Sequence, residues 1–247
     1  MSAVLQIRAL SKRLHAGVPG CAATALVLGD VWLDVAAGER VALCSRDATA
    51  RSALLLCAAG LMRADAGSVQ LRGAAAYVAG DPPSLGGLTV AELLEWHRRT
   101  LIARDVGMST QALAPSAALR AADCESLADV RVRLLSPTSA RRVAVARALV
   151  ARPSLLAVDA PSHAPSHARS EARDEMDRTL ARVAGAGVAV LFSADADATL
   201  AAGVRAIWLR DRGLVVPPMP RRRRADGRDG SSSAARRAVA EQAAPTI

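Results

Sequence analysis

One strand–loop–helix segment restricts what this chain can fold into more than any other. The run Glu39–Leu43 reads as a buried strand, and an apolar, helix-like run begins at Ser52. A loop in this context is where proteins place a phosphate-binding loop of the pattern Gly-x-x-x-x-Gly-Lys-Ser/Thr. Here Ser45 and Ala50 occupy the two glycine positions. Arg51 stands at the lysine position, and only Ser52 matches the pattern.

Strand-like and helix-like runs alternate along most of the chain, which predicts an α/β fold with a mainly parallel sheet covered on both faces. The strands are expected at 4–10, 31–35, 40–44, 68–72, 74–78, 155–158, 188–192 and 206–209, with 68–72 and 74–78 as a hairpin-like pair. Helices are expected at 52–62, 88–101, 138–151, 171–183 and 195–202, and within the alanine-rich stretch 105–134.

The positive charge is carried almost entirely by arginine. The formal net charge is +9, and Lys12 is the only lysine. From Pro218 onwards seven arginines oppose three acidic residues (7 − 3 = +4), which leaves +5 for the rest of the chain. This tail contains Arg221–Arg224 and a Gly/Ser-rich run without periodicity. We expect it to be disordered and solvated, with no specific nucleic acid partner, and contact with anionic lipid or RNA is the alternative.

Cysteine usage and hydropathy indicate a cytoplasmic chain. The four cysteines show no paired spacing, as expected for buried thiols in a reducing compartment. No uninterrupted apolar run reaches about 18 residues, the length that predicts a membrane span. The N-terminal residues lack the basic-then-apolar layout of a signal peptide.

Several segments in order resemble the ATP-binding subunit of ABC transporters over roughly residues 3–216. Asp30–Leu43 resembles the entry to the phosphate loop, and Gly60–Gly73 resembles the segment after its helix. Leu88–Leu94 resembles the start of the helical subdomain, and Leu135–Pro161 resembles the signature motif running into the Walker B strand. The resemblance implies a domain at 1–216 with a RecA-like P-loop NTPase core, an antiparallel β subdomain and an inserted helical subdomain at about 81–154. The basic tail would then occupy 217–247.

The segment that the resemblance identifies as the phosphate loop lacks the glycines and the lysine that the family uses there. The family uses glycines there, so that backbone N–H groups turn inward around the phosphates. In this chain each non-glycine residue that needs a left-handed backbone would cost about 1–2 kcal/mol. The guanidinium of Arg51 is planar and bulkier than the compact ammonium of lysine, so it would pair with a phosphate only from a shifted position. The candidate nucleotide-binding residues are Ser45, Arg46, Asp47, Ala48, Thr49, Ala50, Arg51, Ser52 and Ala53, together with Ser136 of the signature motif.

Two residues keep the family's Mg²⁺ chemistry, namely the hydroxyl of Ser52 and the carboxylate of Asp159 at the end of Walker B. Ordinary helix-start and strand-end polarity is the alternative interpretation of both. The next position, where the family places the glutamate that polarises water, is Ala160. A positioned base contributes about 10²–10⁴ in rate, and alanine has no group to replace it. We therefore assign no catalytic residue.

The remaining sensing positions of the family also differ. The Q-loop glutamine aligns with Gly80, the switch histidine with Ala194, and the aspartate after Walker B with Ser166. Ser136 of the signature is kept, but a proline follows it and removes a backbone donor. The aromatic residue that stacks on adenine would lie near Leu14.

These substitutions lead to the hypothesis of a degenerate ABC subunit that binds ATP and Mg²⁺ weakly or not at all and does not hydrolyse ATP alone. It would dock under a transmembrane permease at the inner face of the membrane, with a second ATP-binding subunit in a homodimer or heterodimer. A non-catalytic scaffold or regulatory pseudo-ATPase is the alternative, and an ATPase active through further compensation is another.

Three other groups of residues carry weaker signals. His163 and His167 are separated by a proline, which argues against one helical face and a metal site. Arg141, Arg142 and Arg147 are interpreted as a solvated basic helix face, and Trp96 and Trp208 as packing residues.

Overall fold

A computed structural model describes residues 3–15, 24–80, 87–103, 112–159, 169–196, 198–210 and 213–215. The chain divides into two units, Met1–Pro217 and Pro218–Ile247, and all of the described residues lie in the first unit. The boundaries predicted for the helical subdomain and for the disordered tail stay predictions.

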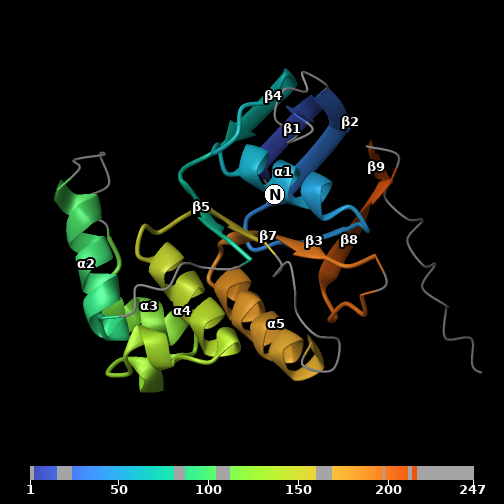
Figure 1. Cartoon of the computed structure of the whole chain (residues 1–247). Helices are drawn as coiled ribbons and strands as arrows, with labels where there is room; N and C mark the ends of the chain where they lie inside the picture. The colour runs from blue at the N-terminus through green and yellow to red at the C-terminus, as the bar shows by residue number, and fades with distance from the viewer. Residues whose placement is uncertain are drawn as a thin grey trace, which may run out of the picture. The chain divides into compact units, whose positions relative to one another are not determined.

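A six-stranded sheet forms the centre of the first unit (Figure 1). Its neighbouring strands are parallel except for the last pair, which is antiparallel. This arrangement confirms the predicted α/β fold with a mainly parallel sheet. In order across the sheet the strands are β5 (Ala75–Val78), β6 (Leu155–Val158), β7 (Ala189–Ala194), β3 (Arg40–Cys44), β8 (Val204–Arg210) and β9 (Gly213–Val215).

A second, three-stranded sheet is antiparallel, as the predicted β subdomain requires. Its order is β2 (Thr24–Ala36), β1 (Ala3–His15) and β4 (Ala66–Leu71). Helix α1 (Ala48–Ala58) contacts all three of these strands and also β5, β6 and β7 of the larger sheet. The helix therefore lies between the two sheets (Figure 1).

Two helices, α4 (Pro137–Leu149) and α5 (Arg169–Gly185), pack on the opposite face of the larger sheet. Helices α2 (Val90–Ala103) and α3 (Pro115–Ala121) pack against α4, and short 3-10 turns lie at Glu125–Leu127 and Val132–Leu134. Side chains alternate along the strands between the two faces. In β3, Val41 and Leu43 join the core around α1, whereas Ala42 and Cys44 join the core around α4 and α5. Both faces are buried, which explains the continuous apolar run of this strand.

Two local predictions are wrong. The segments 68–72 and 74–78 do not pair as a hairpin, because β4 belongs to the antiparallel sheet and β5 to the larger one. The chain crosses between the sheets at Gly73, which has a φ of +91°, and the Ser154 hydroxyl donates to the carbonyls of Arg72 and Ala74 on either side. The helix expected at 195–202 is also absent from the described residues 195–196 and 198–202. At its expected start, the Asp195 carboxylate lies 3.5 Å from the Arg51 guanidinium.

Candidate functional site

The predicted phosphate loop joins β3 to α1, and its backbone differs from the expected one. Helix α1 begins at Ala48 rather than at Ser52, so positions 48–51 of the predicted loop form the first helical turn. None of the residues 45–52, all of which the structure describes, has a positive φ. The predicted left-handed strain is therefore absent, because the helix extends toward β3 in place of an open, glycine-like loop.

Several backbone N–H groups of this loop, but not all of them, are hydrogen-bonded within the chain. Asp47 is the N-cap of α1, and its carboxylate accepts from the N–H of Ala50 at 3.1 Å. The N–H of Asp47 donates to the Ser45 hydroxyl at 3.0 Å, and the N–H of Ser45 donates to the Ala194 carbonyl at 3.3 Å. A helix N-terminus attracts anions through its dipole and unpaired N–H groups. Here the Asp47 carboxylate lies at the N-terminus of α1, where a bound anion would otherwise lie.

The side chain of Arg51, the cation of the loop, is also bound by groups of the chain itself. Arg51 is 7% exposed, and its guanidinium donates to the Ser45 carbonyl. A second guanidinium nitrogen lies 3.5 Å from the carboxylate of Asp195, which follows β7. The Nε–H of Arg51 is buried and has no hydrogen-bond partner in the described part of the chain. The side chain at the lysine position is therefore turned onto the loop's own backbone.

Asp47→Ala should lower the free energy of unfolding by about 1 kcal/mol, the usual contribution of an N-cap side chain. The loss arises because the Ala50 N–H loses its carboxylate partner. Urea denaturation of the purified chain measures the effect. The exposed neighbour Arg46 supplies the control, since Arg46→Ala should change the stability by less than about 0.5 kcal/mol. Equal stability of the Asp47 variant and the parent would contradict the capping role.

Asp159 and Ser52, the two predicted metal residues, are in direct contact. The Ser52 hydroxyl donates to Oδ2 of Asp159 at 2.5 Å. Two further hydroxyls converge on the same carboxylate, from Tyr77 to Oδ2 at 3.1 Å and from Ser193 to Oδ1 at 2.8 Å. Asp159 is only 7% exposed. The buried carboxylate is therefore stabilised by hydroxyl groups from α1, β5 and β7.

The Asp159 cluster also reaches the helix that follows the signature motif. Arg141 of α4 donates to the backbone carbonyl of Asp159 at 2.7 Å. Burial, and then the neighbouring carboxylate, raise the pKa of Tyr77 far above its usual value, so its hydroxyl stays a donor. Sequence reasoning missed Tyr77, Ser193 and Arg141, since they come from separate elements that only the fold brings together.

The fit of Mg²⁺ at this place depends on the nucleotide. Ser52 and Asp159 supply one hydroxyl and one carboxylate, and Mg²⁺ sites of this kind are completed by phosphate oxygens and water. Among the described residues, no group of three or more His, Cys, Asp or Glu side chains could hold a metal ion. The pair would therefore hold Mg²⁺ only together with a triphosphate, after the hydrogen bond between its two members had opened.

The signature serine has a structural partner of its own. Ser136 is the N-cap of α4, and its hydroxyl accepts from the N–H of Ser139 at 3.1 Å. Pro137 takes the first helical position, where its missing N–H is tolerated. Gly80 and Ala194 are described, and neither carries a polar side chain. Ala160, His163, Ser166 and His167 lie outside the described residues.

The interpretation of the α4 arginines as a solvated face is wrong for two of them. Arg141 reaches the Asp159 carbonyl, as described above. Arg142 has a side chain only 12% exposed, and it pairs with Glu175 of α5 and with Asp123 at 3.6 Å. The acidic partners come from elements distant in sequence, which is why the helix alone suggested solvent exposure.

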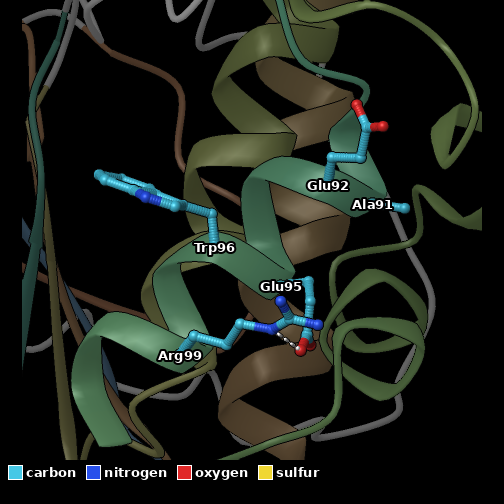
Figure 2. Close-up of a pocket in the computed structure, with 5 residues that line it drawn as sticks. All are labelled: Ala91, Glu92, Glu95, Trp96 and Arg99. Carbon is cyan, nitrogen blue, oxygen red and sulfur yellow. Dashed lines mark hydrogen bonds and ion pairs between the residues drawn. The ribbon is translucent and has the colours of Figure 1, made fainter. Parts of the chain in front are cut away.

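A hollow of about 430 Å³ on α2 is separate from the phosphate loop. Figure 2 shows the lining residues, with the Trp96 indole pointing away from the ion pair between Glu95 and Arg99. Hydrogen bonds from Arg98 and Arg99 lower the pKa of Glu95 to about 2, so its charge is matched locally. Trp96 is 55% exposed, so its predicted packing role is wrong, whereas Trp208 packs against the core.

Comparison with known proteins agrees with this architecture. The family model described as ABC transporter matches residues 28–163. The chain is 32% identical over 199 residues to the aliphatic sulfonates import ATP-binding protein SsuB of Mycobacterium avium (strain 104), covering 77% of this chain and 74% of that protein. It is 35% identical over 152 residues to the molybdenum import ATP-binding protein ModC of Mycobacterium tuberculosis (strain ATCC 25618 / H37Rv), covering 53% of this chain and 41% of that protein.

Solved structures share the fold. An inward-facing conformation of a putative metal-chelate type ABC transporter superposes with a TM-score of 0.68 at 17% identity, covering 87% of this chain and 82% of that one. The ADP conformation of an ATP-binding cassette, MJ1267, gives a TM-score of 0.67 at 15% identity, covering 87% and 90% of the two chains.

The fold and the phosphate-loop position define an ABC-type nucleotide-binding domain. The chain belongs to the ABC transporter family, as an ATP-binding subunit. Proteins of this family bind ATP together with Mg²⁺ and work with permease subunits. No helix in the described ranges is both long enough and apolar enough to span a bilayer.

Proposed function

We propose that this chain is a degenerate ATP-binding subunit that binds Mg²⁺–ATP weakly or not at all and does not hydrolyse it alone. The observation that carries the proposal is the internal hydrogen bonding of the loop at 45–52. Asp47 supplies the anion at the start of α1, and Arg51 is held by Ser45 and Asp195. A triphosphate would have to displace both interactions. It would also be repelled by the Asp47 carboxylate, which occupies the position that a phosphate group would take.

The chain would act at the inner face of the membrane, docked on a transmembrane permease beside a second ATP-binding subunit. The relatives named above are import proteins, which favours a permease that takes up its solute. A competent second subunit would supply the working nucleotide site, and this chain would transmit movement to the permease. The Ser136 side chain caps its own helix, which also weakens the signature face that the family offers to the partner's nucleotide.

A non-catalytic scaffold, or a regulatory pseudo-ATPase with no transport role, is the second candidate. It is favoured by the cluster at Asp159, where three hydroxyls and Arg141 link four elements through hydrogen bonds. Such a cluster would stabilise the fold through contacts of the chain itself. Purification from cells distinguishes the candidates, because a co-purified permease supports the transport role and its absence supports the scaffold.

Titration with a fluorescent ATP analogue tests the proposed function. We expect no saturation in the micromolar range and no strengthening by Mg²⁺, because the N–H groups of Asp47 and Ala50 and the guanidinium of Arg51 already have partners within the chain. The SsuB protein of Mycobacterium avium, titrated in parallel, is the positive control for the probe. Micromolar, Mg²⁺-dependent binding or steady turnover by the isolated chain would refute the proposal and indicate an ATPase that is active through compensation.

A further inference from the structure

We propose that Asp195 sets the affinity of this loop for polyphosphate anions, by holding Arg51 in its inward position. This inference rests on the function proposed above, since it explains what keeps triphosphate off the loop. It assigns a role to a residue that sequence comparison did not select. The ligand class is a polyphosphate anion, with or without a nucleoside.

The geometry places Asp195 where it can act on Arg51. Asp195 follows β7, and β7 lies beside β3, which leads into the loop. Its carboxylate is 3.5 Å from the guanidinium of Arg51. The Asp195 side chain is 53% exposed, whereas that of Arg51 is 9% exposed. The carboxylate is therefore at the surface, where it pairs with the buried cation and occupies the side of the guanidinium that an external anion would approach.

In the inward position of Arg51, not all of the guanidinium N–H donors have a hydrogen-bond partner in the described part of the chain. One guanidinium nitrogen donates to the Ser45 carbonyl and another pairs with Asp195, but Nε–H is buried without a partner in the described part of the chain. A buried, unpaired donor disfavours the state that contains it. The Asp195 pair offsets this penalty, so its loss should release the guanidinium toward an external anion.

Charge acts in the same direction. Asp47 and Asp195 place two carboxylates at the loop, one at the N-terminus of α1 and one at Arg51. Both repel a polyphosphate, which carries several negative charges. Removing Asp195 therefore does two things, since it frees a cation and removes an anion. The experiment must separate the specific effect from the general effect of one fewer negative charge.

Inorganic triphosphate is the probe, titrated against the purified full chain and followed by ³¹P NMR, which measures millimolar dissociation constants. Asp195→Ala should bind triphosphate about fivefold more tightly than the parent chain, the size expected for one partly exposed ion pair. Asp34→Ala is the matched control. Asp34 is also an ion-paired aspartate, 2.7 Å from Arg8 on the antiparallel sheet, and its side chain is 55% exposed.

A double variant shows whether Asp195 acts through Arg51. In Asp195→Ala with Arg51→Met, the cation is replaced by an apolar side chain suited to a buried position, and the gain should disappear. The inference is overturned if Asp195→Ala binds no more tightly than the parent or than Asp34→Ala. Retention of the gain in the double variant would also overturn it. Absence of detectable binding by any variant counts as the same negative result.

The proposed function and this inference fail in different ways. Micromolar Mg²⁺–ATP binding by the parent chain refutes the proposed function, whatever the Asp195 variant does. Weak binding by the parent with no gain in Asp195→Ala leaves the proposed function standing and removes only the role of Asp195.

Discussion

Asp159→Ala is expected to lower the free energy of unfolding by about 3 kcal/mol, measured by urea denaturation in EDTA without nucleotide. The carboxylate is buried and accepts from the hydroxyls of Ser52, Tyr77 and Ser193. A hydrogen bond to a charged group contributes about 1.5–3 kcal/mol, and part of the sum is offset by the desolvation of the charge. Alanine removes all three interactions at once and leaves three hydroxyls to find new partners.

Two further variants separate a structural role from a metal-binding one. Ser193→Ala removes a single donor to the carboxylate and should lower the stability by about 1–2 kcal/mol. Asp159→Asn keeps the shape of the side chain, so its free energy of unfolding should lie between those of the parent and the alanine variant. If the carboxylate served only to bind Mg²⁺, its removal would leave the free energy of unfolding in EDTA unchanged or would raise it. A loss below about 1 kcal/mol for Asp159→Ala would therefore contradict the structural role.

Ala160→Glu alone is expected to leave ATP turnover at background, although it restores the residue that the family uses to polarise water. A positioned base contributes about 10²–10⁴ in rate only when the substrate is held beside it. In this chain the loop that should hold the triphosphate is capped by Asp47, and its cation is held by Ser45 and Asp195. Phosphate release by the purified chain is the measurement.

A combined variant tests the reason for this result. Restoring the loop through Ser45→Gly, Asp47→Ala, Ala50→Gly and Arg51→Lys, together with Ala160→Glu, should raise turnover by about 10²-fold or more. The same loop variant with Ala160→Gln is the control, because glutamine matches glutamate in shape and lacks the base. Urea denaturation verifies that the loop variants remain folded. Rescue by Ala160→Glu in the otherwise unchanged chain would refute the account of the loop.

Much of the fold was predictable because burial leaves a clear periodic signal. β3 and β6 have the predicted bounds, since each is a short apolar run buried on both faces. The pairing of β4 and β5 was not predictable from their short separation, because the turn at Gly73 leads from one sheet to the other and depends on distant Ser154. Local sequence does not contain such a contact.

Two residues of the candidate site, Ser52 and Asp159, could be predicted from the sequence. The backbone conformation of the loop that precedes Ser52 was not predicted correctly. The fold brings Ser52 and Asp159 together, as their aligned positions indicated. The earlier start of α1 could have been found from Asp47, because aspartate before a helical run is a common N-cap. Tyr77, Ser193 and Asp195 carried no signal of their own, since each contributes through a partner far away in the sequence.

A crystal structure of the chain grown with millimolar ATP and Mg²⁺ tests the central claim most directly. We predict an unoccupied loop, with the Asp47 carboxylate on the Ala50 N–H and the Arg51 guanidinium against the Ser45 carbonyl and Asp195. Electron density for a triphosphate along residues 45–52, with Mg²⁺ at Ser52 and the side chains of Asp47 and Arg51 displaced, would contradict it.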